Sequence, residues 1–167
     1  MGTAQELVIF VENNQERFYK VAYTYVKNRE DALDIVHNAI VKALQSYHRL
    51  KKPDYAQTWF YRILINESVS FLRKKKRILS LEEIPSLQSC SDTSGSELHK
   101  DEYIDLYTAI DKLPPEMKTI IILRFFEDMK LDEVAEITST NLSTVKSRLY
   151  RALKYLKVDM EGLEYDR

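Results

Sequence analysis

The C-terminal third of the sequence carries residues whose types and spacing suit contact with duplex DNA. Residues 137–158 hold five basic side chains and no acidic one. Apolar residues recur there at helical spacing and predict the buried face of one helix: Val145, Leu149, Ala152, Leu153 and Leu156. Donor side chains point away from that stripe: Thr144, Lys146, Ser147, Arg148, Arg151 and Lys154. Lys and Arg can bind O6 and N7 of guanine, and Ser and Thr can bind bases or phosphates, so this face is predicted to read DNA.

A short apolar pattern precedes this helix and favours a helix-turn-helix. Leu131, Val134 and Ile137 mark the short helix, residues 139–141 form a polar turn, and Ser143 is predicted to cap the long helix. We expect Ser143 to lie in the same DNA-binding surface. The alternative is a basic helix of an ordinary bundle, with no nucleic acid bound.

A second candidate site combines cations with aromatic rings in residues 46–77, which hold nine basic and two acidic residues. Aromatic planes beside cations are what single-stranded bases stack on. The side chains expected to reach nucleic acid are Lys51, Lys52, Tyr55, Arg62, Asn66, Arg73 and Lys74. Trp59, Ile63 and Phe71 fit the core of the same helix better.

A third set is polar and partly acidic. In a helix predicted to start after Asn28, a candidate N-cap, Asp31, Asp34 and Asn38 fall on one face at spacings of three, four and seven. The opposite face is apolar and includes Leu33, Val36 and Leu44, so one side is predicted core and the other is available to a partner.

Catalytic chemistry has little support. The three His residues have no metal-ligand spacing, and no glycine-rich phosphate loop is present. The sequence predicts no enzyme, no metal site and no cofactor.

These side chains must be positioned by helices. Three Gly and four Pro among 167 residues are too few for an all-β chain, and the apolar spacing is helical throughout. We therefore predict an all-α chain. The net charge of -1 hides two basic segments separated by an acidic one, which indicates two polyanion-binding surfaces.

A Ser-rich stretch at residues 86–96, following Pro85, divides the chain in two. The expected organisation is a first domain at 1–77, a flexible linker at 78–100, a second domain at 101–160 and a tail at 161–167. In the second domain, Pro115 is expected to open a helix.

The single cysteine, Cys90, excludes an intramolecular disulfide and indicates a reducing compartment. No export signal or membrane-spanning run is recognisable. The expected location is cytoplasmic.

Taken in order, five motifs resemble the extracytoplasmic-function (ECF) group of bacterial sigma factors, and they cover nearly the whole chain. They are residues 29–36 (REDALDIV), 59–66 (WFYRILIN), 71–77 (FLRKKKR), 113–115 (LPP) and 144–153 (TVKSRLYRAL). Within that group the chain is most similar to the sigma-V-like members of Gram-positive bacteria.

The resemblance implies a two-domain transcription initiation factor. Its sigma-2 domain would bind core RNA polymerase through the second helix, with Asp31, Asp34, His37 and Asn38, and would melt the minus-ten promoter element. Its sigma-4 domain would seat the last helix in the minus-thirty-five element. An anti-sigma factor, often membrane-anchored, would hold the protein inactive. His37 and Asn38 stand where many members have Gln followed by an acidic residue.

Two other functions compete with this interpretation. A one-component repressor or activator would share the helix-turn-helix but need a ligand-sensing or dimerising first module. An RNA-binding adaptor would use the basic-aromatic surface and leave the helix-turn-helix unexplained.

Overall fold

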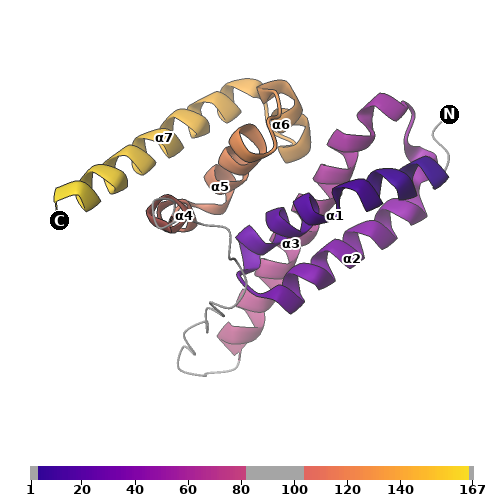
Figure 1. Ribbon diagram of the computed structural model, residues 1–167, viewed down its shortest axis with the longest axis horizontal. Coiled ribbons are helices and arrows are strands. Elements are labelled where there is room, and N and C mark those ends of the chain that lie inside the picture. The colour runs from indigo at the N-terminus through magenta and orange to yellow at the C-terminus, as the bar shows by residue number, and fades with distance from the viewer. Residues whose placement is uncertain (1–3, 82–103, 166–167) are drawn as a thin grey trace. The chain divides into compact units, whose positions relative to one another are not determined.

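The computed structural model describes residues 4–81 and 104–165, and these form seven α-helices and no strand (Figure 1). The chain divides into two compact units, residues 1–92 and 93–167. The all-α prediction is confirmed for the described part of the chain. Most of the expected linker, like Cys90, lies outside the described residues.

Unit 1 is a bundle of three helices, α1 (Ala4–Val26), α2 (Arg29–Ser46) and α3 (Ala56–Leu81). Lys27 turns the chain between α1 and α2 with a φ of 53°, and Asn28 caps α2 by accepting a hydrogen bond from the Asp31 amide at 3.0 Å. The expected Asn28 cap is therefore present. Two short 3₁₀ turns, η1 (Tyr47–Arg49) and η2 (Pro53–Tyr55), connect α2 to α3.

An aromatic cluster forms the centre of this bundle. Phe18 of α1 is fully buried, and its ring centroid lies 4.4 Å from that of Phe60 and 5.4 Å from that of Tyr61, both on α3. Phe10 closes the cluster 5.7 Å from Phe18. Aromatic residues carry large apolar areas, so this cluster joins α1 to α3.

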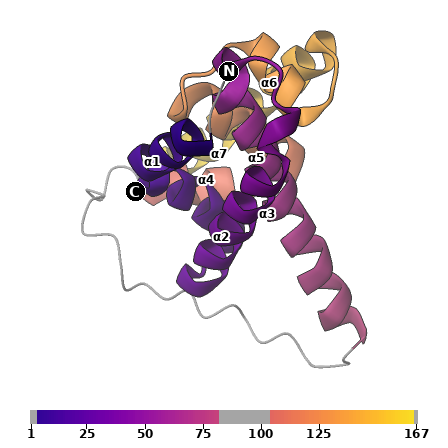
Figure 2. The same cartoon turned by 90° about the vertical axis from the view of Figure 1, so that its right-hand side faces the viewer.

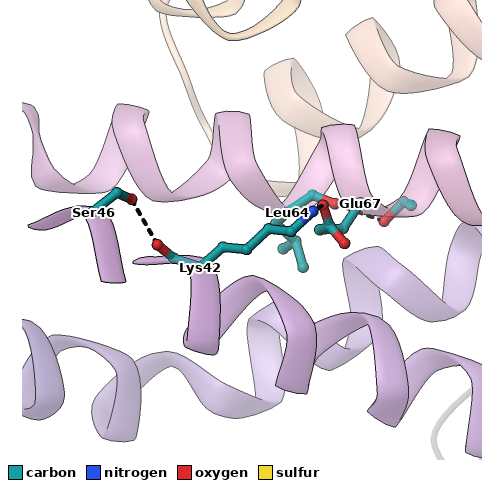
Figure 3. Close-up of polar contacts among 5 residues, drawn as sticks. Lys42, Ser46, Leu64 and Glu67 are labelled. Atoms are coloured by element: carbon teal, nitrogen blue, oxygen red, sulfur yellow. Dashed lines mark hydrogen bonds and ion pairs between the residues drawn. The ribbon is translucent and has the colours of Figure 1, made fainter. Parts of the chain in front are cut away.

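Two ion pairs link α2 to α3 outside the apolar core. The Lys42 ammonium contacts the Glu67 carboxylate, and the Ser46 hydroxyl donates to the Lys42 carbonyl at 2.6 Å (Figure 3). Nearer the start of α2, Lys75 Nζ lies 3.2 Å from Asp31 Oδ2. Each pair joins side chains far apart in sequence, so each depends on the bundle.

The α3 helix is longer than expected. The linker was predicted to start at residue 78, but α3 continues to Leu81, and Ser80 Oγ donates to the Arg77 carbonyl at 2.9 Å. Residues 78–81 contain neither Gly nor Pro, so nothing in them ends a helix. Figure 2 shows this C-terminal part of α3 reaching away from α1 and α2.

Unit 2 consists of α4 (Ile104–Asp111), α5 (Pro115–Ile121), α6 (Leu131–Thr138) and α7 (Leu142–Tyr165). Pro115 is the first residue of α5, as expected, because its missing N–H is not needed there. A π-helical segment, η4 (Ile122–Phe126), extends α5, and the Glu127 amide donates to the Ile122 carbonyl at 3.1 Å. The predicted tail at 161–167 is helical as far as Tyr165, since α7 meets no proline.

Candidate nucleic-acid interfaces

A helix-turn-helix forms at α6 and α7, and Figure 1 shows α6 beside the start of α7. Ser139 ends α6 in the left-handed region with a φ of 53°, and the hydroxyls of Thr138 and Thr140 lie 2.7 Å apart across the turn. Val134 and Ile137 of α6 and Val145 of α7 are buried. The apolar contact sets the position of α7, so its opposite face is directed outward.

The cap of α7 differs from the expectation. Asn141 Oδ1 accepts hydrogen bonds from the Thr144 amide at 2.8 Å and from the Ser143 hydroxyl at 3.2 Å. Ser143 is thus inside the first turn, and the predicted cap at Ser143 is wrong. The asparagine side chain is the better cap here because it lies three residues before the free amide of Thr144.

This difference can be tested by amide hydrogen exchange. We expect Asn141→Ala to speed exchange at Thr144 and to lower the unfolding free energy of unit 2 by about 1 kcal/mol, because an unsatisfied first-turn amide is exposed. Ser143→Ala is the matched control: it removes the hydroxyl contact to Asn141 Oδ1 but leaves the Thr144 amide capped, so both effects should be much smaller. Equal effects of the two substitutions would contradict the assignment.

The predicted reading residues lie around the outer face of α7. Five of them are exposed: Ser143, Lys146, Ser147, Arg151 and Lys154. Thr144 and Arg148 are half-buried at the margins of that face, and the Ser147 hydroxyl donates to the Thr144 carbonyl at 3.0 Å. Leu153, predicted to face the core, is 39% exposed. The first two turns of α7 therefore present a cationic surface to a ligand.

Tyr150 belongs to the same surface and was missed by the residue-type argument. Its side chain is 71% exposed, and it lies four residues from both Lys146 and Lys154. Its spacing from the two lysines could be counted in the sequence, but only Lys, Arg, Ser and Thr were considered there as contacts for DNA. An exposed phenol beside cations can contact DNA through its ring and its hydroxyl.

A second cationic face runs along α3. Arg62, Asn66 and Arg73 are exposed and separated by four and seven residues, so one side of the helix carries all three. Lys74 is exposed on an adjoining side. Glu67, the single acidic residue of α3, is held by Lys42 on α2.

The loop before α3 adds aromatic and basic groups. Lys51, Lys52 and Tyr55 are exposed, and the Lys52 ammonium lies 5.8 Å from the centre of the Tyr55 ring. Tyr61, the neighbour of Arg62 in the sequence, is buried in the aromatic cluster. Trp59, Ile63 and Phe71 are half-buried, between the core and the surface.

The outer face of α2 has a mixed character. Asp34, His37 and Asn38 are exposed, whereas Asp31 is half-buried and paired with Lys75. Leu33 and Leu44, expected in the core, are 49% and 39% exposed. The bundle covers a narrower part of α2 than its apolar residues span, so the uncovered part carries apolar groups as well as Asp34. Exposed apolar patches rimmed by polar groups are typical of protein interfaces.

Within the described residues, no three His, Cys, Asp or Glu side chains gather where they could bind a metal ion. None of the helices searched in that part of the chain has the length and hydropathy required to cross a bilayer.

Each of the two units matches the profile of a known protein family. Residues 10–78 match the profile of Sigma-70 region 2, and residues 103–156 match Sigma-70, region 4. The chain is 46% identical to RNA polymerase sigma factor SigV of Bacillus subtilis (strain 168), over 92% of this chain and 90% of that protein. It is 26% identical to ECF RNA polymerase sigma factor SigW of the same organism, over 97% and 91% of the two chains.

Two solved structures share the fold. One is the sigma factor RpoE of Bartonella quintana in complex with the anti-sigma factor NepR, with a TM-score of 0.79 and 20% identity over 94% of this chain and 98% of that chain. The other is CnrH in complex with the cytosolic domain of CnrY, with a TM-score of 0.69 and 17% identity over 96% and 91%.

The helical fold and the matches of its two units define a transcription initiation protein. The chain belongs to the RNA polymerase sigma factor family, in its ECF group, and is similar to SigV. The repressor and RNA-adaptor alternatives are not favoured, because the first unit matches region 2 and not a sensing or dimerising module.

Proposed function

We propose that this chain binds core RNA polymerase through the outer face of α2 and directs it to promoters with the cationic faces of α3 and α7. One observation carries the proposal: unit 1 and unit 2 each present an outward cationic face on a helix that matches a sigma-factor region. A repressor that binds only duplex DNA does not need exposed side chains that suit an opened strand, such as Tyr55, Arg62 and Asn66.

The α3 face is assigned to the opened minus-ten element. Arg62 and Arg73 supply charge for the backbone, while Tyr55 supplies a ring for an unstacked base and Asn66 an amide that can hydrogen-bond to one. Lys51, Lys52 and Lys74 flank these groups and add sequence-independent attraction for phosphates.

The polymerase surface is assigned to Asp34, His37 and Asn38 with the exposed Leu33 beside them. An apolar residue surrounded by polar ones gives both buried area and orientation at an interface. Asp31 lies at the edge of this surface, where its pairing with Lys75 already occupies one carboxylate oxygen.

Activity is proposed to take place in the cytoplasm and to be restrained by an anti-sigma factor. Support comes from the fold shared with a sigma factor solved with an anti-sigma factor, and with CnrH solved with the cytosolic domain of CnrY. Mixing this chain with a candidate anti-sigma factor should abolish the transcription described next.

Run-off transcription tests the proposal directly. Core polymerase supplemented with this chain should produce discrete transcripts from a genomic DNA library, whereas core alone should not. A chain that binds duplex promoter fragments tightly alone but adds no transcripts to core would instead be a repressor.

A more specific result is expected at the minus-thirty-five element. If the side chain contacts a base edge, Lys146→Ala or Ser147→Ala should weaken promoter binding by about 1–3 kcal/mol. The same variant should lose its preference for one base at one position of the element. If Arg148 and Arg151 bind phosphates, Arg148→Ala and Arg151→Ala should weaken binding to every promoter sequence by the same factor. The measurement is transcription from promoters bearing every single-base change in the element. If none of these variants alters strength or preference, α7 does not read the promoter.

A further inference from the structure

The five consecutive cations at residues 73–77 do not form one surface. Successive residues of an α-helix point about 100° apart, so a run of five is distributed around the helix. Arg77 follows Arg73 by four residues and Asn66 by eleven, which places it on the outward face that also carries Arg62. All four side chains are exposed.

Lys75 occupies the opposite side of α3. It follows the buried Leu64 by eleven residues and the buried Ser68 by seven, so it continues the stripe that faces the bundle. Its ammonium is 3.2 Å from Asp31 Oδ2, and the two side chains are 49% and 25% exposed. Asp31 itself sits in the capped first turn of α2.

Asp31 meets α3 where the helix leaves the bundle. From residue 73 to residue 81 every side chain of α3 is exposed, and a helical stretch this short is marginal without packing. Among the described residues, the Lys75–Asp31 pair ties this exposed stretch to α2. The pair can therefore hold the end of α3 in place without using a cation of the outward face.

The outward face has a length suited to nucleic acid. A rise of about 1.5 Å per residue puts Arg77 about 16 Å beyond Asn66 along the helix. A duplex rises about 3.4 Å per base pair along its axis, so that distance corresponds to about five base pairs of a duplex lying along α3. With Asn66 at its assigned bases, Arg77 would lie over the adjoining DNA.

We propose that Arg77 binds a phosphate of promoter DNA, and that Lys75, held by Asp31, is a positioning residue outside the DNA interface. The proposal rests on the proposed function of α3 and adds a contact to it. It also assigns Asp31 to the fold of unit 1 rather than to polymerase.

Two matched variants test it in the reconstituted holoenzyme. Arg77→Met and Lys75→Met each remove one positive charge, two residues apart in the same run. Promoter affinity is measured over a range of salt concentrations. Arg77→Met should weaken binding severalfold on every promoter and reduce the salt slope by about 0.9, the value for one phosphate contact, while Arg77→Lys should retain the slope. Lys75→Met should leave the slope unchanged.

Amide exchange in the free full chain tests the role of Lys75. Lys75→Met and Asp31→Asn should each speed exchange in residues 73–81, the double variant should be no faster than the faster single one, and Arg77→Met should not speed it. An equal loss of salt slope in the Lys75 and Arg77 variants, or no loss in either, would overturn the assignment of Arg77 to DNA and of Lys75 to the fold. Unchanged exchange in the Asp31 and Lys75 variants would overturn the positioning role. Failure of the wild-type chain to support transcription would instead overturn the proposed function.

Discussion

The double variant Tyr55→Ala, Asn66→Ala should lose most promoter opening while still binding core polymerase. Stacking of one base on an aromatic ring contributes about 1–3 kcal/mol, and loss of the Asn66 amide removes a hydrogen bond in addition. Opening should therefore fall by a factor of about ten or more. Permanganate reactivity of thymines in the minus-ten element measures it.

The control for this variant is Gln57→Ala. Gln57 is exposed on the first turn of α3 but five residues before Arg62, so it points away from the outward face. The Gln57→Ala variant should open promoters at the parental level. This variant and the double variant should compete equally for core polymerase. Parental permanganate reactivity in the double variant would remove Tyr55 and Asn66 from the minus-ten surface.

Phe18→Ala should lower the unfolding free energy of unit 1 by about 3–5 kcal/mol, the usual cost of truncating a buried phenylalanine. Phe18 is 0% exposed and lies between rings of α1 and α3, so its removal leaves a cavity where the helices meet. Trp59, the single tryptophan of the chain, precedes Phe60 on α3 and reports this unit by fluorescence during urea unfolding.

Phe125→Ala provides the matched control, because Phe125 is 56% exposed in unit 2. It should leave the Trp59 transition at the parental urea concentration. A Phe18 variant with an unchanged transition would show that the aromatic cluster does not stabilise unit 1.

Much of the fold could be predicted because helices depend on local spacing. The apolar periodicity of α6 and α7, the Asn28 cap and the start of α5 at Pro115 all act within one or two turns of the chain. Tyr55, Arg62 and Asn66, which the sequence indicated as contacts for nucleic acid, are exposed. Charge segregation located both cationic faces, since it requires only a count along the chain.

Composition and periodicity could not identify the cap of α7 or the exposed leucines of α2. Asn141 and Ser143 are both suitable caps, and only the hydrogen bond to the Thr144 amide distinguishes them. Leu33 and Leu44 belong to the apolar stripe of α2 by spacing, but α1 and α3 cover only part of that stripe. Exposure depends on neighbours that the local pattern does not contain.

The sequence by itself determined that this protein is helical and that its two halves each carry a cationic helix face, but it did not identify Tyr150 as part of the α7 face. Two ion pairs could be found only in the tertiary structure. Asp31 pairs with Lys75, 44 residues away, and Glu67 pairs with Lys42. Helical periodicity is a property of neighbouring residues, whereas ion pairs between helices depend on how the bundle packs. Periodicity places Lys75 and Arg77 on different sides of α3, and the packing of α2 against α3 gives Lys75 its partner, Asp31.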